Sequence, residues 1–171
     1  MAFIFCSAIA SAGTQLPIAR DMMSEAKQAE RFGLPLIVLV SLKGCVHCEV
    51  VRRSHLMPLL GDSARSPAAV VRQVEIDGRE LLRDFGGKQI THAEFAKRNH
   101  ADIAPVVFFF DAKGRSLSAP LVGSMIPDFY GAYLDAALVE ALRLWRSGLT
   151  PPRSRAKNQE PGLRPGLFGG T

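Results

Sequence analysis

Two cysteines that lie three residues apart, Cys45 and Cys48, are the side chains whose type and spacing point most directly to chemistry. A thiol at the N-terminus of a helix faces unpaired backbone N–H groups and the positive end of the helix dipole, which favour the thiolate. A partner one helical turn away is close enough to form a disulfide without backbone movement. His47, when protonated, stabilises a thiolate beside it. The spacing therefore predicts a redox pair, although two cysteines at this spacing also bind metal ions.

The elements expected on either side place this pair between a strand and a helix. Residues 35–41, PLIVLVS, form a continuous run of β-branched residues and leucine, which is typical of a strand buried on both faces. Lys43 and Gly44 turn the chain, and a helix is expected from about Val46 to Leu60. Pro58 should bend or end that helix because it lacks an N–H group. Arg52 and Arg53, further along this helix, are expected to be solvated.

The rest of the chain predicts a layered α/β domain. Apolar residues at helical spacing from Leu16 to Phe32 indicate an amphipathic helix that Gly33 ends. Further expected elements are a strand over 70–76, a short helix after the capping pair Thr91 and Glu94, a buried strand over 106–110, a hairpin turn at 112–115, an edge strand over 117–122 and a helix from Pro127. Leu81, Leu82 and Phe85 are expected to be buried. A β-α-β unit followed by a β-hairpin implies a mixed sheet with helices on both faces.

Composition limits the classes of protein that this chain can represent. It has 171 residues, 47% of them hydrophobic and 22% charged, which suits one soluble globular domain. No apolar run is long enough for a multi-pass membrane protein. Of the net charge of +5, +3 lies after Arg146, so the remainder is nearly neutral and a nucleic-acid partner is not expected. Three cysteines are too few for a fold held together by disulfides.

Both ends are expected to lie outside the folded domain. Residues 1–12, MAFIFCSAIASA, are uncharged and end in a small-x-small pattern, which predicts a cleaved signal peptide and a mature chain that lacks Cys6. The alternative is an N-terminal segment that frays or docks on the core. Residues 147–171 are basic and rich in proline and glycine, which predicts a disordered tail. The expected domain therefore covers residues 13–146.

The cysteine pair and a later Ala104-Pro105 dipeptide before a buried strand resemble the thioredoxin superfamily. Members carry C-x-x-C at the start of the helix after the central strand, and a cis-proline before the hairpin strand that faces the active site. The resemblance implies a thioredoxin-like fold with a sheet of about four strands, with Ala104 and Pro105 shaping the substrate groove. More narrowly, the Cys-x-x-Cys-Glu stretch, the Phe-Phe-Asp-Ala-Lys-Gly stretch and Asp128-Phe129-Tyr130 resemble thioredoxin-like proteins of bacterial sulfur-oxidation gene clusters. Those are typically exported, which implies a periplasmic location.

Several residues depart from the thioredoxin pattern. Lys43-Gly44 precedes the first cysteine, so Gly44 stands where most thioredoxins have tryptophan. Val46-His47 replaces Gly-Pro between the cysteines. Leu39 occupies the position of their buried acid, so proton exchange with Cys48 must use another group or water. Glu49 is adjacent to Cys48 and is the candidate for this proton exchange. The alternative is that Glu49 is a solvated helix residue.

The sequence thus predicts a thiol–disulfide oxidoreductase that needs no cofactor, acts as a monomer and exchanges disulfides with protein partners. Cys45 is the expected nucleophile and Cys48 the resolving thiol. Two alternatives remain: a copper- or zinc-binding protein that uses both cysteines and a histidine, for which His55 is a candidate, and a non-catalytic thioredoxin-like partner protein. His92 and His100 are expected to be packing or surface residues. Because His47 favours the reduced form, the couple should be more oxidising than an ordinary thioredoxin, within roughly −270 to −120 mV.

Overall fold

The computed structural model describes residues 15–60, 69–124 and 127–148. A four-stranded sheet in the order β2-β1-β5-β6 forms its centre. The strands are β1 (Leu36–Ser41), β2 (Val70–Glu75), β5 (Val106–Phe110) and β6 (Leu121–Val122). β1 runs parallel to β2 and antiparallel to β5, and β6 pairs antiparallel with β5 at the edge. The predicted mixed sheet of about four strands is confirmed.

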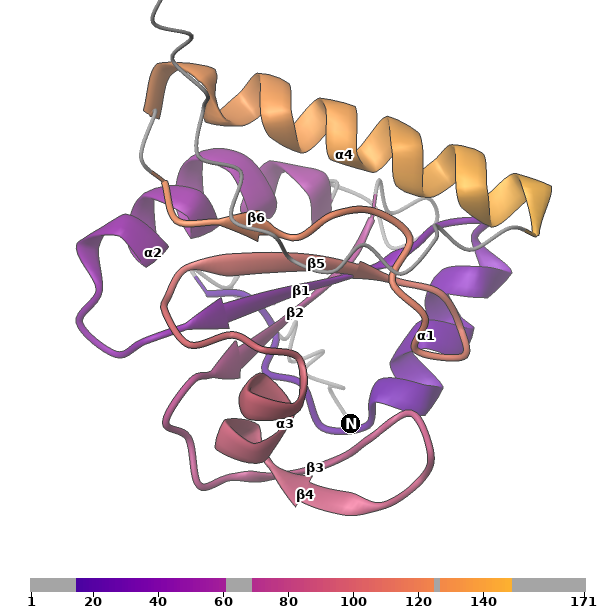
Figure 1. Cartoon of the computed structure of the whole chain (residues 1–171), viewed down its shortest axis with the longest axis horizontal. Coiled ribbons are helices and arrows are strands. Elements are labelled where there is room, and N and C mark those ends of the chain that lie inside the picture. Colours follow the sequence, from indigo (N-terminus) through magenta and orange to yellow (C-terminus); the bar gives the residue numbers. More distant parts are fainter. Residues whose placement is uncertain (1–14, 61–68, 125–126, 149–171) are drawn as a thin grey trace, which may run out of the picture.

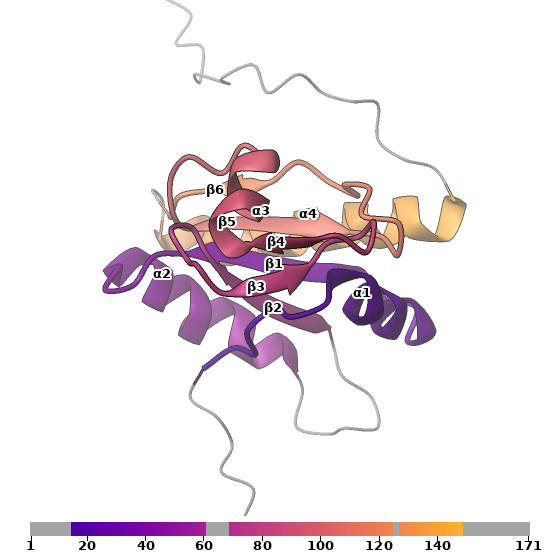
Figure 2. The ribbon, with the colours of Figure 1, turned by 90° about the horizontal axis from the view of Figure 1, so that it is seen from below.

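Helices cover both faces of this sheet. On one face lie α2 (Val46–Val50) and α4 (Pro127–Ser147), and on the other lie α1 (Met22–Arg31), α3 (His92–Arg98) and the two-stranded hairpin of β3 (Leu81–Arg83) and β4 (Gln89–Thr91). In Figure 1, α4 and α2 lie above the sheet and α3 with β3–β4 below it. The view from below in Figure 2 has α3 and the hairpin nearest the viewer.

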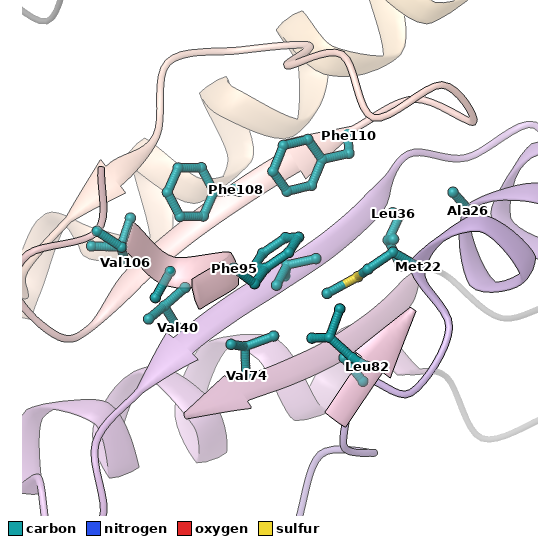
Figure 3. Close-up of a cluster of buried hydrophobic side chains, with 14 of the residues drawn as sticks. Met22, Ala26, Leu36, Val40, Val74, Leu82, Phe95, Val106, Phe108 and Phe110 are labelled. Carbon is teal, nitrogen blue, oxygen red and sulfur yellow. The ribbon is translucent and has the colours of Figure 1, made fainter. Parts of the chain in front are cut away.

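The central strands are buried on both faces, as their uninterrupted apolar runs predict. Alternate residues of β1 therefore enter two separate cores. Val38 and Val40 pack with α1, α3 and two phenylalanines of β5, Phe108 and Phe110. Figure 3 shows Val40 in this core. Ile37 and Leu39 pack on the opposite face with Phe109, beneath α4 and the helical turns that continue α2. Burial on both sides makes β1 a rigid support for the loop that follows it.

The first helix is shorter than its apolar spacing predicts. α1 begins at Met22, after Asp21, whose carboxylate accepts a hydrogen bond from the Ser24 N–H at 3.0 Å. Leu16 and Ala19 are buried, but they lie on an extended segment. The Ala19 N–H of that segment donates to the Gln73 carbonyl of β2 at 2.9 Å. The prediction of a helix from Leu16 is wrong because this backbone pairs with a strand.

The helix that begins at the cysteine pair is continuous from Val46 to Leu60, but only its first five residues are α-helical. Residues Val51–Leu56 form a π-helix and Met57–Leu60 a 3-10 helix, so the predicted disturbance around Pro58 is present. Proline cannot donate to a carbonyl one turn earlier, which disfavours regular α-helix in the preceding turn. The regular part of the helix is thus the part that carries the cysteines.

Three local predictions in the second half of the chain had different outcomes. The capping pair is confirmed, since Thr91 Oγ1 accepts from the Glu94 N–H at 3.1 Å at the start of α3. The edge strand is shorter than predicted: Ser116 forms one isolated bridge to Phe110, and regular pairing covers only β6. Leu82 is buried, but Leu81 is 60% exposed, which contradicts its expected burial because the strand β3 turns alternate side chains outward.

Candidate functional site

The cysteine pair lies where β1 ends and α2 begins. Cys45 is the N-cap of α2, and its Sγ accepts a hydrogen bond from the Cys48 N–H at 3.1 Å. The preceding Gly44 adopts a φ of +77°, a left-handed conformation that glycine allows without strain, and this turn directs the chain into the helix. Cys45 and Cys48 form a disulfide with 5.2 Å between their Cα atoms.

The two sulfur-bearing residues differ in exposure. Cys45 is partly exposed, whereas Cys48 is completely buried. A partner can therefore approach Cys45 from solvent, and Cys48 lies behind it. In the reduced protein, the same N–H groups at the first turn of α2 would face the sulfur of Cys45 and favour its thiolate.

Ala104 and Pro105 lie immediately before β5, and the peptide bond between them is cis. In the sheet register, Val106 pairs with Val40 near the end of β1 that leads into the cysteine loop. Pro105 is buried and Ala104 is partly exposed. The topology thus brings the predicted substrate-binding dipeptide and the cysteine pair to the same end of the sheet.

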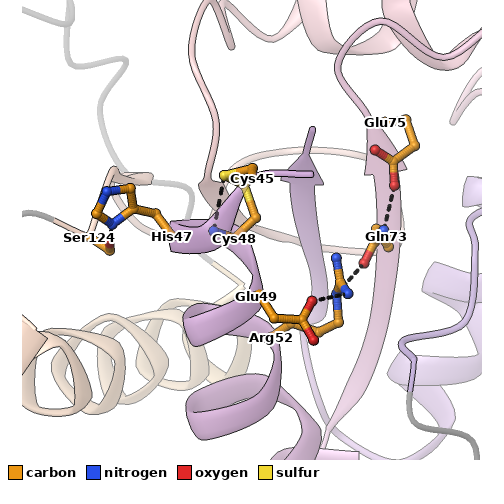
Figure 4. The surroundings of a disulfide bond; sticks show 8 residues. All are labelled: Cys45, His47, Cys48, Glu49, Arg52, Gln73, Glu75 and Ser124. Atoms are coloured by element: carbon orange, nitrogen blue, oxygen red, sulfur yellow. Dashed lines mark hydrogen bonds and ion pairs between the residues drawn. A yellow bond between two sulfur atoms is a disulfide. The ribbon is translucent and has the colours of Figure 1, made fainter. Parts of the chain in front are cut away.

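His47 projects from the first turn of α2 and is exposed. Its Nδ1 lies 2.9 Å from Oγ of Ser124, a residue that follows β6 (Figure 4). Sequence reasoning did not identify Ser124. No local pattern marks this serine, because the contact joins residues that are 77 positions apart.

Glu49 belongs to a polar network, and its side chain is 36% exposed. Its carboxylate is paired with both Arg52 and Arg53, and Arg52 Nε donates to the Gln73 side-chain oxygen at 3.0 Å. Gln73 in turn donates to Glu75 at the end of β2 (Figure 4). The side chain of Arg52 is only 14% exposed, so its predicted solvation is wrong, while that of Arg53 is 66% exposed as expected.

This network lines one side of a cleft of about 780 Å³ that reaches Cys45. Other walls come from the cysteine loop and from the turn after β2, with Lys43, Asp77, Arg79 and Glu80 contributing charge. Neither Ala104 nor Pro105 lines it. Because β1 lies between β2 and β5, Cys45 is flanked by the cleft on the β2 side and by the Ala104-Pro105 edge on the β5 side. No pattern in the sequence predicts the cleft.

The remaining histidines are separate from the cysteines in their contacts. His55 packs against the ring of Tyr130, with 4.9 Å between the ring centroids. His92 is buried between the end of β2 and the segment before α1, in keeping with the packing role expected of it, and His100 is exposed. Within residues 15–60, 69–124 and 127–148, no group of three or more histidine, cysteine or acidic side chains is placed to hold a metal ion. Among the same residues, no helix is long and apolar enough to cross a membrane.

The sheet order, the helices on both faces, the disulfide at the start of α2 and the proline before β5 define a thioredoxin-like fold with a disulfide-bonded C-x-x-C pair. No protein-family model and no curated protein sequence matches the chain.

Solved structures that are similar to this chain include a thioredoxin-fold protein, a thioredoxin and an oxidoreductase. A thioredoxin-fold protein from Helicobacter pylori is 14% identical over 68% of this chain and 84% of its own, with a TM-score of 0.40. Thioredoxin O2 from Arabidopsis thaliana, in its oxidised state, is 15% identical over 72% and 96%, with a TM-score of 0.45. The oxidoreductase DsbH is 14% identical over 84% and 96%, with a TM-score of 0.46.

Proposed function

We propose that this protein is a thiol–disulfide oxidoreductase that exchanges disulfides with protein partners through Cys45 and Cys48. The observation that carries the proposal is the unequal burial of the pair: the sulfur that caps α2 is reachable from solvent, and its partner is completely buried. A structural disulfide gains nothing from such an arrangement, whereas exchange chemistry requires one accessible thiol and one protected thiol.

In the reducing direction, the thiolate of Cys45 attacks one sulfur of the partner's disulfide. A mixed disulfide forms between Cys45 and the partner, and the other partner sulfur leaves as a thiolate that takes a proton. Cys48 then loses its proton and attacks the Cys45 sulfur, which releases the second partner thiol and leaves the Cys45–Cys48 disulfide. Two electrons pass from the dithiol to the partner, and the reverse sequence oxidises a partner dithiol.

The dithiol itself carries these electrons, so the proposal includes no cofactor. Ala104 and Pro105 form the edge against which an extended partner segment lies. His47 favours the reduced form of the pair, and Glu49 or water near Cys48 exchanges its proton. We further propose an extracytoplasmic, periplasmic location and a role close to that of the exported thioredoxin-like proteins of sulfur-oxidation gene clusters, on the sequence patterns given above.

Trapping experiments test the roles of the two cysteines. Cys48→Ser should accumulate covalent complexes with partner proteins, visible on non-reducing gels and lost on addition of dithiothreitol, because the mixed disulfide at Cys45 cannot be resolved. Cys45→Ser is the matched control, and it should trap nothing because the remaining thiol is buried. If Cys45→Ser trapped partners and Cys48→Ser did not, the proposed roles would be reversed. If neither variant formed mixed disulfides and the purified wild type held stoichiometric copper or zinc through dialysis, the oxidoreductase proposal would fail.

A further inference from the structure

One hydrogen bond connects α2, which carries the two cysteines, to the residue pair that follows β6. His47 lies between the two cysteines on the first turn of α2, and its Nδ1 is 2.9 Å from Ser124 Oγ (Figure 4). The histidine is exposed, but the serine is only 8% exposed. An exposed imidazole would otherwise sample several side-chain rotamers. The contact with a buried hydroxyl therefore holds this ring in one orientation.

Ser124 is itself held by the strands that carry Pro105. The neighbouring Gly123 donates its N–H to the Pro105 carbonyl at 2.8 Å, and Val122 of β6 pairs with Val106 of β5. Gly123 has a φ of +74°, so the chain turns immediately before Ser124 in a conformation that favours glycine. The serine hydroxyl thus has a position set by the same backbone that forms the Ala104-Pro105 edge.

A serine hydroxyl suits this contact because it can both donate and accept. It donates to Nδ1 of a neutral imidazole and accepts from the Nδ1–H of an imidazolium. The bond therefore survives a change in the charge of His47, and the ring stays in place whether or not it carries a proton. Nε2 is left available for other contacts at the surface of the site.

We propose that Ser124 is a positioning residue for the redox pair: its hydroxyl fixes the imidazole of His47 against the β5–β6 edge and thereby sets how strongly His47 favours the reduced cysteines. The inference rests on the proposed exchange function, and it assigns a role to a residue outside the C-x-x-C segment. A ring fixed by this bond keeps one position relative to the cysteine pair, whereas a freely rotating ring would not.

Equilibration with defined ratios of reduced and oxidised glutathione tests this role in the full-length protein. The measured quantity is the equilibrium constant for reduction of the Cys45–Cys48 disulfide. Ser124→Ala should lower this constant about threefold, which corresponds to a potential about 14 mV more reducing for a two-electron couple. His47→Ala should lower it by at least as much. In the His47→Ala background, Ser124→Ala should have no further effect.

Two control variants separate positioning from a general effect of losing a hydroxyl. Ser124→Thr keeps the hydroxyl and should keep the wild-type equilibrium constant. Ser118 has another buried hydroxyl, in the chain between β5 and β6, and this hydroxyl donates to the neighbouring Ala119 carbonyl. Ser118→Ala removes it and should not change the equilibrium constant. If Ser124→Ala folds poorly, judged by its urea unfolding midpoint, Ser124→Gly removes the same hydroxyl and should give the same threefold change.

An unchanged equilibrium constant in Ser124→Ala would overturn the inference, and so would an equal decrease with and without His47. If the wild-type pair exchanges normally with glutathione and Ser124→Ala has the same equilibrium constant, only the role of Ser124 is overturned. The proposed function then remains intact. A wild-type pair that does not exchange with glutathione at all would instead contradict the proposed function, and the role of Ser124 would fall with it.

Discussion

His92 is predicted to be a major source of stability where α3 meets the end of β2. Its side chain is completely buried at the first position of α3. Nδ1 accepts a hydrogen bond from the Glu75 N–H at 3.2 Å, and Nε2 lies 3.0 Å from the Ala19 carbonyl oxygen. Because Nδ1 accepts, Nε2 must carry the proton and donate it to Ala19. One ring therefore joins the end of β2, the segment before α1 and the start of α3.

His92→Leu introduces an apolar side chain of similar size and removes both bonds. It leaves one buried N–H and one buried carbonyl without their partner, and each such group costs about 1–3 kcal/mol. We expect the free energy of unfolding to fall by about 3 kcal/mol, against a typical total of about 5–15 kcal/mol. For a domain of this size, that loss corresponds to a decrease in Tm of roughly 10 °C.

Urea unfolding monitored by circular dichroism measures the effect. His92→Asn can still accept from the Glu75 N–H and His92→Gln can still donate to the Ala19 carbonyl, so each should recover part of the loss. His100→Asn is the surface control, because His100 is exposed and asparagine tolerates its positive φ of 57°. The reasoning would be refuted if His92→Leu unfolded within 1 kcal/mol of the wild type, or if asparagine and glutamine were no better than leucine.

Two further predictions concern Tyr130 and the N-terminus. Burial raises the pKa of the Tyr130 phenol above its ordinary value near 10. Above pH 10 the unfolded chain releases this proton while the folded protein retains it, so wild-type stability should fall by about 1.4 kcal/mol per pH unit from this group. Tyr130→Phe should lack that decrease in urea titrations from pH 9 to 11, and parallel slopes in both proteins would contradict the assignment. Tyr130→Phe should be neutral or stabilising at pH 7, because the hydroxyl has no hydrogen-bond partner among the described residues. If residues 1–12 are a signal peptide, mass spectrometry of the protein from its native host should find a mature chain that begins near Gly13 and lacks Cys6, whereas an intact Met1 would defeat the proposed export.

Local sequence was sufficient for the elements whose signals are local. The uninterrupted apolar runs of β1 and β5 predicted strands buried on both faces, because only such strands lack polar alternation. The Thr91 cap depends on a residue three positions away, and the strand–turn–helix context of Cys45 and Cys48 lies within one short segment. The placement of the cysteine pair at a helix N-terminus could therefore be predicted without the structure. The two ends of the chain, residues 1–12 and most of 147–171, lie outside the described residues, so those predictions stay open.

Tertiary structure decided the features that depend on distant partners. Apolar spacing shows that Leu16 and Ala19 are buried, but it cannot show that their backbone pairs with Gln73 of β2 instead of forming a helix. Arg52 has the sequence environment of a solvated residue, and the approach of Gln73 connects its local pair with Glu49 to β2. The bond from His47 to Ser124 has no local signal, because the two residues meet only after β5 and β6 have paired beside the cysteine helix. Periodicity reports which side chains leave water, whereas the partner that each polar group finds is determined by the packing of the whole domain.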